Sequence, residues 1–213
     1  MKIKKKPIVE VQPKDVYISF SMRTENLSFK HCIRFKGSIK ISNDLVEEEI
    51  GILKLTQLNF GNALNEGEDW RDLIDLVDDD LLDECEPIIN SKFRNRLSDD
   101  FENMMSEHDF YSTPTLMVLS KLGIYKKYRG NNLLGSILGM INSISPEAVM
   151  VTHPFPLQHN TENEENLKIV GIKSEKKATL KTKLADEKKL IKHYEKHGFE
   201  RLGNSDTWIK FPY

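Results

Sequence analysis

The stretch at residues 125–138, YKKYRGNNLLGSIL, places positive charge and a glycine directly before an apolar run with helical spacing. The first backbone N–H groups of a helix have no partner within the helix and lie at the positive end of its dipole. Lys126, Lys127 and Arg129 would add charge, and Gly130 would let a bound group approach the backbone closely. These residues favour binding of an anion such as a phosphate. The same pattern is also typical of an ordinary basic helix start.

A second stretch with chemical potential is HYEKHGFERLG at residues 193–203. His193 and His197 are four residues apart on one helix face, as a zinc site requires, but Glu195 is not directly after the first histidine and no third ligand is apparent. We therefore predict no metal site. Without further context, Tyr194 is a half-buried aromatic residue on an amphipathic helix that Gly198 would end.

The bulk composition restricts the class of protein. Of the 213 residues, 38% are hydrophobic and 30% are charged, and no run approaches the roughly 18 apolar residues that a membrane span needs. The N-terminal lysines precede no apolar signal-peptide region, and Cys32 and Cys85 are too few for a disulfide framework. We expect a cytoplasmic protein with one domain, a monomer or homodimer with no membrane partner.

The net charge of −2 hides an uneven distribution. Residues 66–109 hold sixteen Asp and Glu against four Lys and Arg, whereas residues 168–196 hold ten lysines against four acids. Such runs usually form solvated helix faces. They could also attract opposite partners, a cationic substrate on one side and an anionic cofactor or polymer on the other.

The first third of the chain has the pattern of strands. Ile33 and Phe35, then Ile39 and Ile41, alternate with polar residues, which is the period of a half-buried strand. We predict strands over residues 16–22, 31–41 and 49–60, with a turn at 42–44.

The period then changes to that of a helix. The apolar residues from Trp70 to Leu81 follow helical spacing with aspartates between them, and further helices are expected over 87–97 and 101–107. A strand at 114–124, a turn at 125–132, a helix at 133–144 and a strand at 147–153 then predict a βαβ unit. An exposed polar loop at 159–168, a helix from Leu184 towards Gly198 and a strand at 207–213 complete the chain.

This order of strand, YRGNNLLGSIL helix, strand, YEKHGF helix and strand resembles the GCN5-related N-acetyltransferase (GNAT) family. The resemblance covers residues 114–213 and, in outline, the earlier strands. It implies an α/β (α+β) acyl-CoA N-acyltransferase fold with a mixed, mostly antiparallel central sheet and helices on both faces. Residues 1–60 would form N-terminal strands, 66–109 an acidic helical insertion and 114–213 the acetyl-CoA-binding core. The chain would be a divergent member, because its acidic helices follow the third strand.

The resemblance also assigns residues to the cofactor. The family's loop, Arg/Gln-x-x-Gly-x-Gly/Ala, cups the pyrophosphate of acetyl-CoA; Arg129 matches it, whereas Asn132 and Leu134 replace small residues. The strand before the loop would pair through its backbone with the pantetheine arm. The implied cofactor-binding residues are Leu122, Ile124, Arg129, Gly130, Asn131, Asn132, Leu133, Leu134 and Gly135.

The implied reaction is direct transfer of the acetyl group from acetyl-CoA to a primary amine, possibly a cationic one. Tyr194 would be the general acid that protonates the leaving thiolate. A general base must take the amine proton, and Glu49, Glu107 and Asp109 are candidates near predicted strand ends. The alternative is a non-catalytic module of the same fold that binds coenzyme A or a protein. Nucleic-acid binding through the lysine-rich stretch is disfavoured by sparse aromatic residues and the slightly acidic composition.

Overall fold

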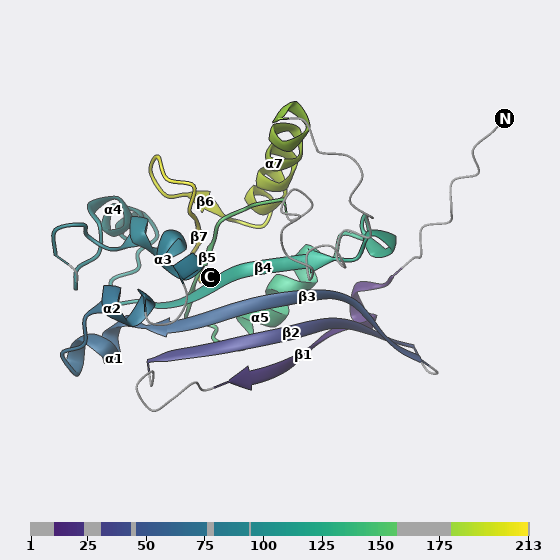
Figure 1. Cartoon of the computed structure of the whole chain (residues 1–213), viewed down its shortest axis with the longest axis horizontal. Helices are drawn as coiled ribbons and strands as arrows, with labels where there is room; N and C mark the ends of the chain where they lie inside the picture. The colour runs from purple at the N-terminus through teal and green to yellow at the C-terminus, as the bar shows by residue number, and fades with distance from the viewer. Residues whose placement is uncertain are drawn as a thin grey trace.

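One seven-stranded sheet organises the protein, with the strand order β1-β2-β3-β4-β5-β7-β6 (Figure 1). The computed structural model describes residues 11–23, 31–43, 46–75, 79–93, 95–156 and 180–212. Neighbouring strands pair antiparallel except β4 and β5, which are parallel, so the predicted mixed, mostly antiparallel sheet is confirmed. The strands are β1 (Val16–Arg23), β2 (Cys32–Asn43), β3 (Val46–Asn59), β4 (Thr115–Ile124), β5 (Val149–Thr152), β6 (Glu200–Arg201) and β7 (Trp208–Lys210).

Helices connect these strands. The α-helices are α1 (Phe60–Asn65), α2 (Trp70–Asp75), α3 (Asp79–Cys85), α4 (Asp99–Glu107), α5 (Leu134–Asn142) and α7 (Leu180–Glu195). The short 3₁₀ helices are η1 (Pro13–Asp15), η3 (Glu86–Ile88) and η4 (Lys126–Tyr128). Helices α1 to α4 lie between β3 and β4, where the acidic insertion was predicted, and α5 joins β4 to β5. None of the helices described here combines the length and apolar character that crossing a bilayer requires.

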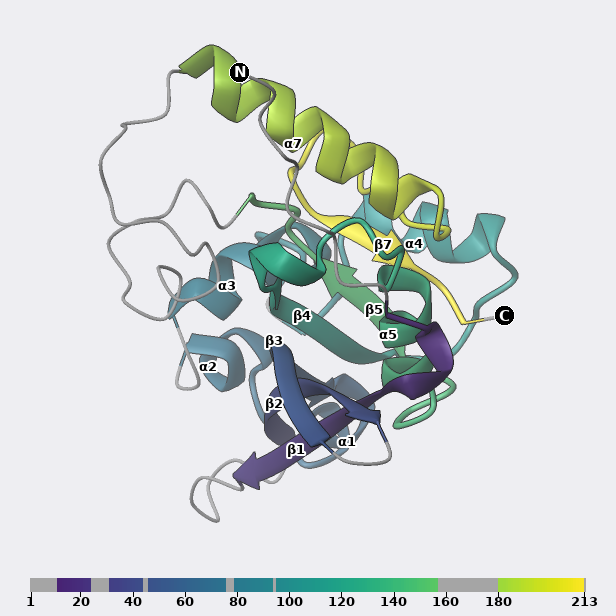
Figure 2. The ribbon, with the colours of Figure 1, turned by 90° about the vertical axis from the view of Figure 1, so that its right-hand side faces the viewer.

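Each face of the sheet has its own hydrophobic core, because successive side chains of a strand point to opposite faces. In β4, Leu116 and Val118 pack into the core that contains buried residues of α1 to α4. Met117 and Leu119 pack into the other core with residues of α5 and α7. Figure 2 shows α2 and α3 on one side of β4 and α5 on the other. The predicted placement of helices on both faces is therefore confirmed.

The helix predicted over residues 87–97 is wrong. The chain forms only the 3₁₀ turn η3 there, and Ile89 has extended backbone angles. The Asn90 side chain accepts hydrogen bonds from the backbone N–H groups of Lys92 and Phe93, both at 3.0 Å. This local turn satisfies backbone donors that a helix would otherwise use, and a bridge between Ile89 and Leu97 closes the segment.

Other boundaries differ from the predictions for local reasons. Phe60, predicted as the end of a strand, begins α1, because the Asn59 side chain caps this helix by accepting a hydrogen bond from the N–H of Asn62 at 2.9 Å. The stripe predicted as one helix over 70–81 contains α2 and the start of α3, with residues 76–78 outside the described chain. The polar loop predicted at 159–168 also lies outside the described residues. Strand β6 was not predicted.

Candidate functional site

The candidate site lies where β4 and β5 stop pairing. Residues 116–119 of β4 pair with 149–152 of β5, and β4 then continues to Ile124 alongside β3. At this point β4 contains a bulge, since Lys54 of β3 pairs with Lys121 and Leu55 pairs with Leu119, which leaves Ser120 as an extra residue. Bulges redirect a strand and are frequent beside functional sites. The half-buried Leu122 and the backbone of residues 120–124 thus lie on a strand edge beyond the end of the β5 pairing.

Tyr194 reaches this point from α7. Its side chain is buried, with 5% exposure, and its ring packs edge-on against Phe199 with 5.1 Å between centroids. Its hydroxyl lies beside Thr152, the last residue of β5. Thr152 Oγ1 donates its proton to the Leu119 carbonyl at 3.0 Å, which ties the end of β5 to β4. The structure therefore holds the tyrosine hydroxyl at the divergence of the two parallel strands.

The surroundings of Tyr194 keep its hydroxyl protonated. The pKa of Tyr194 is raised to about 12, mainly by burial and also by the charge of Glu84, while the neighbouring Thr152 side chain opposes the shift. A phenol with this pKa carries its proton at neutral pH. Tyr194 can therefore donate a proton to a neighbouring group but cannot serve as a base.

Glu84 on α3 is a functional candidate that the sequence analysis missed. Its side chain is only 7% exposed, and its Oε2 accepts a hydrogen bond from the hydroxyl of the bulge residue Ser120 at 2.9 Å. Its backbone carbonyl accepts a further bond from Thr207 Oγ1 at 3.1 Å. The available signal was helical spacing, since Glu84 follows the buried Leu81 by three residues and so lies on the same helix face.

The carboxylates predicted as general bases have other surroundings. Glu49 is exposed and accepts hydrogen bonds from Ser38, at 2.7 Å, and from the hydroxyl of Tyr125. Asp109 is exposed and accepts from Tyr111 at 3.1 Å, and the exposed Glu107 ends α4. None of the three is buried against the bulge as Glu84 is, so Glu84 replaces them as the best-placed carboxylate.

The backbone of the predicted phosphate loop is shaped so that a bound group could come close to it. Gly130 and Asn132 both have left-handed backbone angles, with φ of 89° and 53°. Asparagine is among the few residues besides glycine that adopt this conformation readily, so Asn132 takes a backbone angle that a motif glycine could supply. No atom of the described residues lies within 4 Å of the position that a Cβ of Gly130 would occupy, which leaves space beside the backbone.

The other residues of the loop fix its shape. Asn131 Oδ1 accepts a hydrogen bond from the N–H of Val11 at 3.1 Å, and Nδ2 donates to the Tyr128 carbonyl at 2.8 Å. Arg129 Nε donates to the Ile124 carbonyl at 2.8 Å, at the end of β4. The loop is thus tied to β4 and to the segment before β1.

The start of α5 presents backbone rather than side chains. Its N-cap residue Leu133 makes no side-chain capping bond, and Leu133 and Leu134 are both buried in the core. The N–H groups of the first turn thus have no cap from this residue.

Gly135 has a packing role, because an added Cβ would lie 2.9 Å from the His197 ring. The pKa of His197 is lowered mainly by burial.

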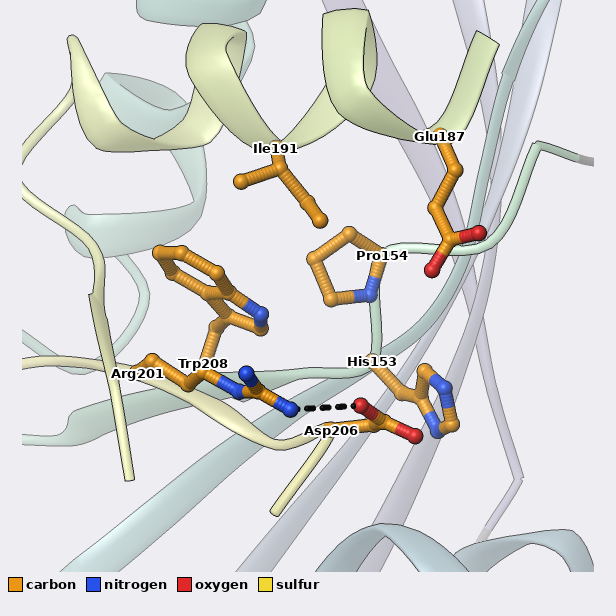
Figure 3. Close-up of a pocket in the computed structure, with 7 residues that line it drawn as sticks. All are labelled: His153, Pro154, Glu187, Ile191, Arg201, Asp206 and Trp208. Carbon is orange, nitrogen blue, oxygen red and sulfur yellow. Dashed lines mark hydrogen bonds and ion pairs between the residues drawn. The ribbon is translucent and has the colours of Figure 1, made fainter. Parts of the chain in front are cut away.

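A pocket of about 120 Å³ adjoins the tyrosine site (Figure 3). Ile191 lies one turn before Tyr194 on α7, and Trp208 of β7 pairs directly with Thr152. The Arg201 guanidinium forms an ion pair with Asp206 at 2.9 Å. Figure 3 shows Ile191 and Trp208 on one side of this space and Glu187 with His153 on the other. The lining residues are His153, Pro154, Glu187, Ile191, Arg201, Asp206 and Trp208.

His193 of α7 and His197 of the turn after it belong to no group of three possible metal ligands among the described residues. The rings of His193 and His197 meet edge to face with 5.4 Å between centroids. Within the described part of the chain, the one group of three side chains that could hold a metal ion is instead His31, Glu66 and Glu68. It lies at the start of β2 and in the turn after α1.

No family model matches this chain, no curated protein matches its sequence, and no solved structure matches its fold. The chemistry of the site therefore has to be inferred from its own geometry.

Proposed function

We propose that the protein is a GNAT-like N-acetyltransferase that moves the acetyl group of acetyl-CoA to a primary amine. The observation that carries the proposal is the position of the buried, protonated Tyr194 hydroxyl, which lies beside Thr152 where the parallel strands β4 and β5 stop pairing. A general acid for thioester cleavage needs a proton donor at such a shielded point.

The donor would bind along β4 and the loop after it. The uncapped N–H groups at the start of α5, the open backbone at Gly130 and the charge of Arg129 suit a pyrophosphate. The edge of β4 over residues 120–124, with which β5 does not pair, suits the amide-containing pantetheine arm, since an extended chain can add to a strand edge through main-chain hydrogen bonds. This arrangement would bring the thioester towards Tyr194.

In the transfer step, a new bond forms between the amine nitrogen and the acetyl carbon, and the bond from that carbon to sulfur breaks. Tyr194 would donate its proton to the leaving sulfur, so that coenzyme A departs as the thiol. Glu84 would take the proton from the amine, directly or through the Ser120 hydroxyl that it binds at 2.9 Å. Transfer of that proton back to the phenolate through solvent restores both groups.

The acceptor would approach from the face covered by α1 to α4. Glu84 lies there, and the acidic residues of these helices favour a cationic amine because a field of this sign concentrates cations. The preference for a cationic amine depends on the proposed reaction, and a comparison of neutral with cationic amines tests it.

Calorimetric titration of the full chain with acetyl-CoA, followed by measurement of thiol release with neutral and cationic amines, tests the proposal. We expect saturable binding and amine-dependent thiol release, fastest with a cationic amine. Absence of binding at high micromolar acetyl-CoA would remove the proposal.

The second candidate is a non-catalytic module of the same fold that binds coenzyme A or a protein. It is favoured by Leu134, whose buried side chain occupies a position where the family has glycine or alanine. Tight binding of acetyl-CoA without thiol release for any amine in the panel would select this candidate.

A further inference from the structure

His31 is a buried polar side chain with an unsatisfied nitrogen. The residue is 6% exposed, and its Nε2 has no hydrogen-bond partner among the residues that the structure describes. Two carboxylates face this nitrogen, Glu66 Oε2 at 3.5 Å and Glu68 Oε2 at 3.7 Å. Buried polar atoms are rarely left without a partner, because desolvation is then uncompensated. The buried His31 nitrogen therefore calls for a partner, and the two carboxylates beside it are suited to share a cation with it.

The spacing of the three atoms fits a metal ion better than a hydrogen bond. An N–H to oxygen bond spans about 2.7 to 3.2 Å, less than either distance at His31. Zinc binds nitrogen and oxygen at about 2.0 to 2.2 Å, so two ligands of a tetrahedral ion lie roughly 3.4 Å apart. The three ligand atoms lie within 4.8 Å of one another. A small shift of exposed carboxylates would bring all three to one ion.

The turn after α1 places the Glu66 and Glu68 side chains beside His31. The Glu66 N–H donates to the carbonyls of Asn62 and Ala63 at 3.2 Å, and the Glu68 N–H donates to the same Ala63 carbonyl at 2.9 Å. Gly67 between them has a φ of 77°, which permits this tight turn. The two carboxylates thus leave a well-defined turn on either side of one glycine.

The histidine is fixed to the same unit through the backbone. Its carbonyl accepts a hydrogen bond from the N–H of Asn59 at 2.9 Å, and Asn59 also caps the start of α1. Position 59 therefore couples the beginning of β2 to the helix whose end carries the glutamates. Such preorganisation is what a metal site needs from its supporting residues.

We propose that His31, Glu66 and Glu68 bind a divalent transition-metal ion, with Zn²⁺ as the best fit. An imidazole nitrogen with two carboxylates suits zinc, whereas calcium and magnesium prefer oxygen ligands alone. The Glu66 and Glu68 side chains are 43% and 35% exposed, so an ion can enter from solvent and keep a water molecule as its fourth ligand. The ion would join β2 to the α1 turn. This site departs from the sequence expectation of no metal, and it does not rest on the proposed function.

Titration of the chelator-treated full chain with CoCl₂ tests the site, because Co²⁺ occupies zinc sites and gives visible absorption when bound. We expect a visible band that saturates at one equivalent, disappears on addition of ZnCl₂, and accompanies a rise in the melting temperature with Zn²⁺. Glu66→Gln and Glu68→Gln keep the side-chain shape and lie at exposed positions, so both variants should fold. Each should weaken Co²⁺ binding at least tenfold.

Glu102→Gln is the matched control, since Glu102 is an exposed acid on α4 outside the cluster, and its Co²⁺ affinity should equal that of the unaltered protein. Absence of the band up to millimolar Co²⁺ would overturn the proposal. Equal binding by the Glu66→Gln and Glu68→Gln variants and the unaltered protein would also overturn it, because the ion would then be bound elsewhere.

Discussion

The two faces of the sheet carry different chemistry around the same strand. On one face, α5 has no charged residue, and the loop before it contains Lys126, Lys127 and Arg129. On the other face, α2, α3 and α4 are rich in acids. Tyr194 of α7 lies on the first face and Glu84 of α3 lies on the second, and both lie near the β4 bulge. The charge of Glu84 raises the pKa of Tyr194. The difference teaches that one sheet can keep a basic loop on one face apart from acidic helices on the other, with Tyr194 and Glu84 meeting between them.

The largest effect on turnover is expected from removing the Glu84 carboxylate on α3. Glu84→Gln should lower turnover about 100-fold or more, since general bases contribute roughly 10²–10⁴-fold, while the amide oxygen can still accept the Ser120 hydrogen bond. Acetyl-CoA affinity should stay unchanged. Steady-state thiol release and calorimetry measure the two quantities.

Asp83→Asn is the control for this prediction, because Asp83 is an exposed acid next to Glu84 on α3. It should leave turnover within about twofold of the unaltered protein. If both variants lose the same activity, the effect belongs to the general acidity of the helix and Glu84 is not the base.

On the face that carries Tyr194, we expect the free energy of unfolding to fall at alkaline pH. Because the pKa of Tyr194 is raised from 10.0 to about 12 in the folded state, its stabilising effect is complete below pH 10 and is lost as the pH rises through about 12. Two pKa units correspond to about 2 to 3 kcal/mol. Urea unfolding between pH 9 and 12 should show this loss in the unaltered protein and a smaller one in Tyr194→Phe. Parallel curves for both proteins would contradict the assignment.

The proposed binding of acetyl-CoA by the loop depends on the left-handed backbone at position 132. Asn132→Val should destabilise the protein by roughly 1 to 2 kcal/mol, because a β-branched residue strains at a φ of 53°, and it should also weaken acetyl-CoA binding. Asn132→Gly should bind at least as tightly as the unaltered protein. Urea unfolding and calorimetry separate the two effects, and a Val variant that matches the Gly variant in both would contradict the backbone role.

The smallest change in stability is expected where α5 contacts the turn after α7. Gly135→Ala places a Cβ 2.9 Å from the His197 ring, which is a side chain that can shift, so the cost should be about 1 kcal/mol or less. The double variant with His197→Ala should recover that stability in thermal unfolding. An equal loss in both backgrounds would show that helix packing elsewhere is responsible.

Much of the fold could be predicted from the sequence, because the alternation in residues 31–41 and the apolar helical stripe from Trp70 report burial directly. The helix predicted at 87–97 failed because the Asn90 side chain competes for backbone donors, a local effect that periodicity does not show. Strand β6 is too short to carry a pattern.

The site was only partly predictable for a different reason. Tyr194 and the loop lie in short contiguous motifs, whereas Glu84 is one of sixteen acids between residues 66 and 109 and is distinguished by its burial and its contact with Ser120. The bulge that exposes Ser120 follows from pairing between β3 and β4, which no single strand encodes. The cluster of His31 with Glu66 and Glu68 likewise depends on tertiary placement.

The central claim is that Tyr194 acts as the proton donor in acetyl transfer, and turnover of Tyr194→Phe at saturating acetyl-CoA tests it most directly. We predict that thiol release falls about 100-fold or more while calorimetry gives an unchanged acetyl-CoA affinity, because phenylalanine keeps the packing against Phe199 and removes only the hydroxyl. Tyr111→Phe, at a residue that is 77% exposed, should retain full activity. A Tyr194→Phe variant with unaltered turnover would contradict the claim.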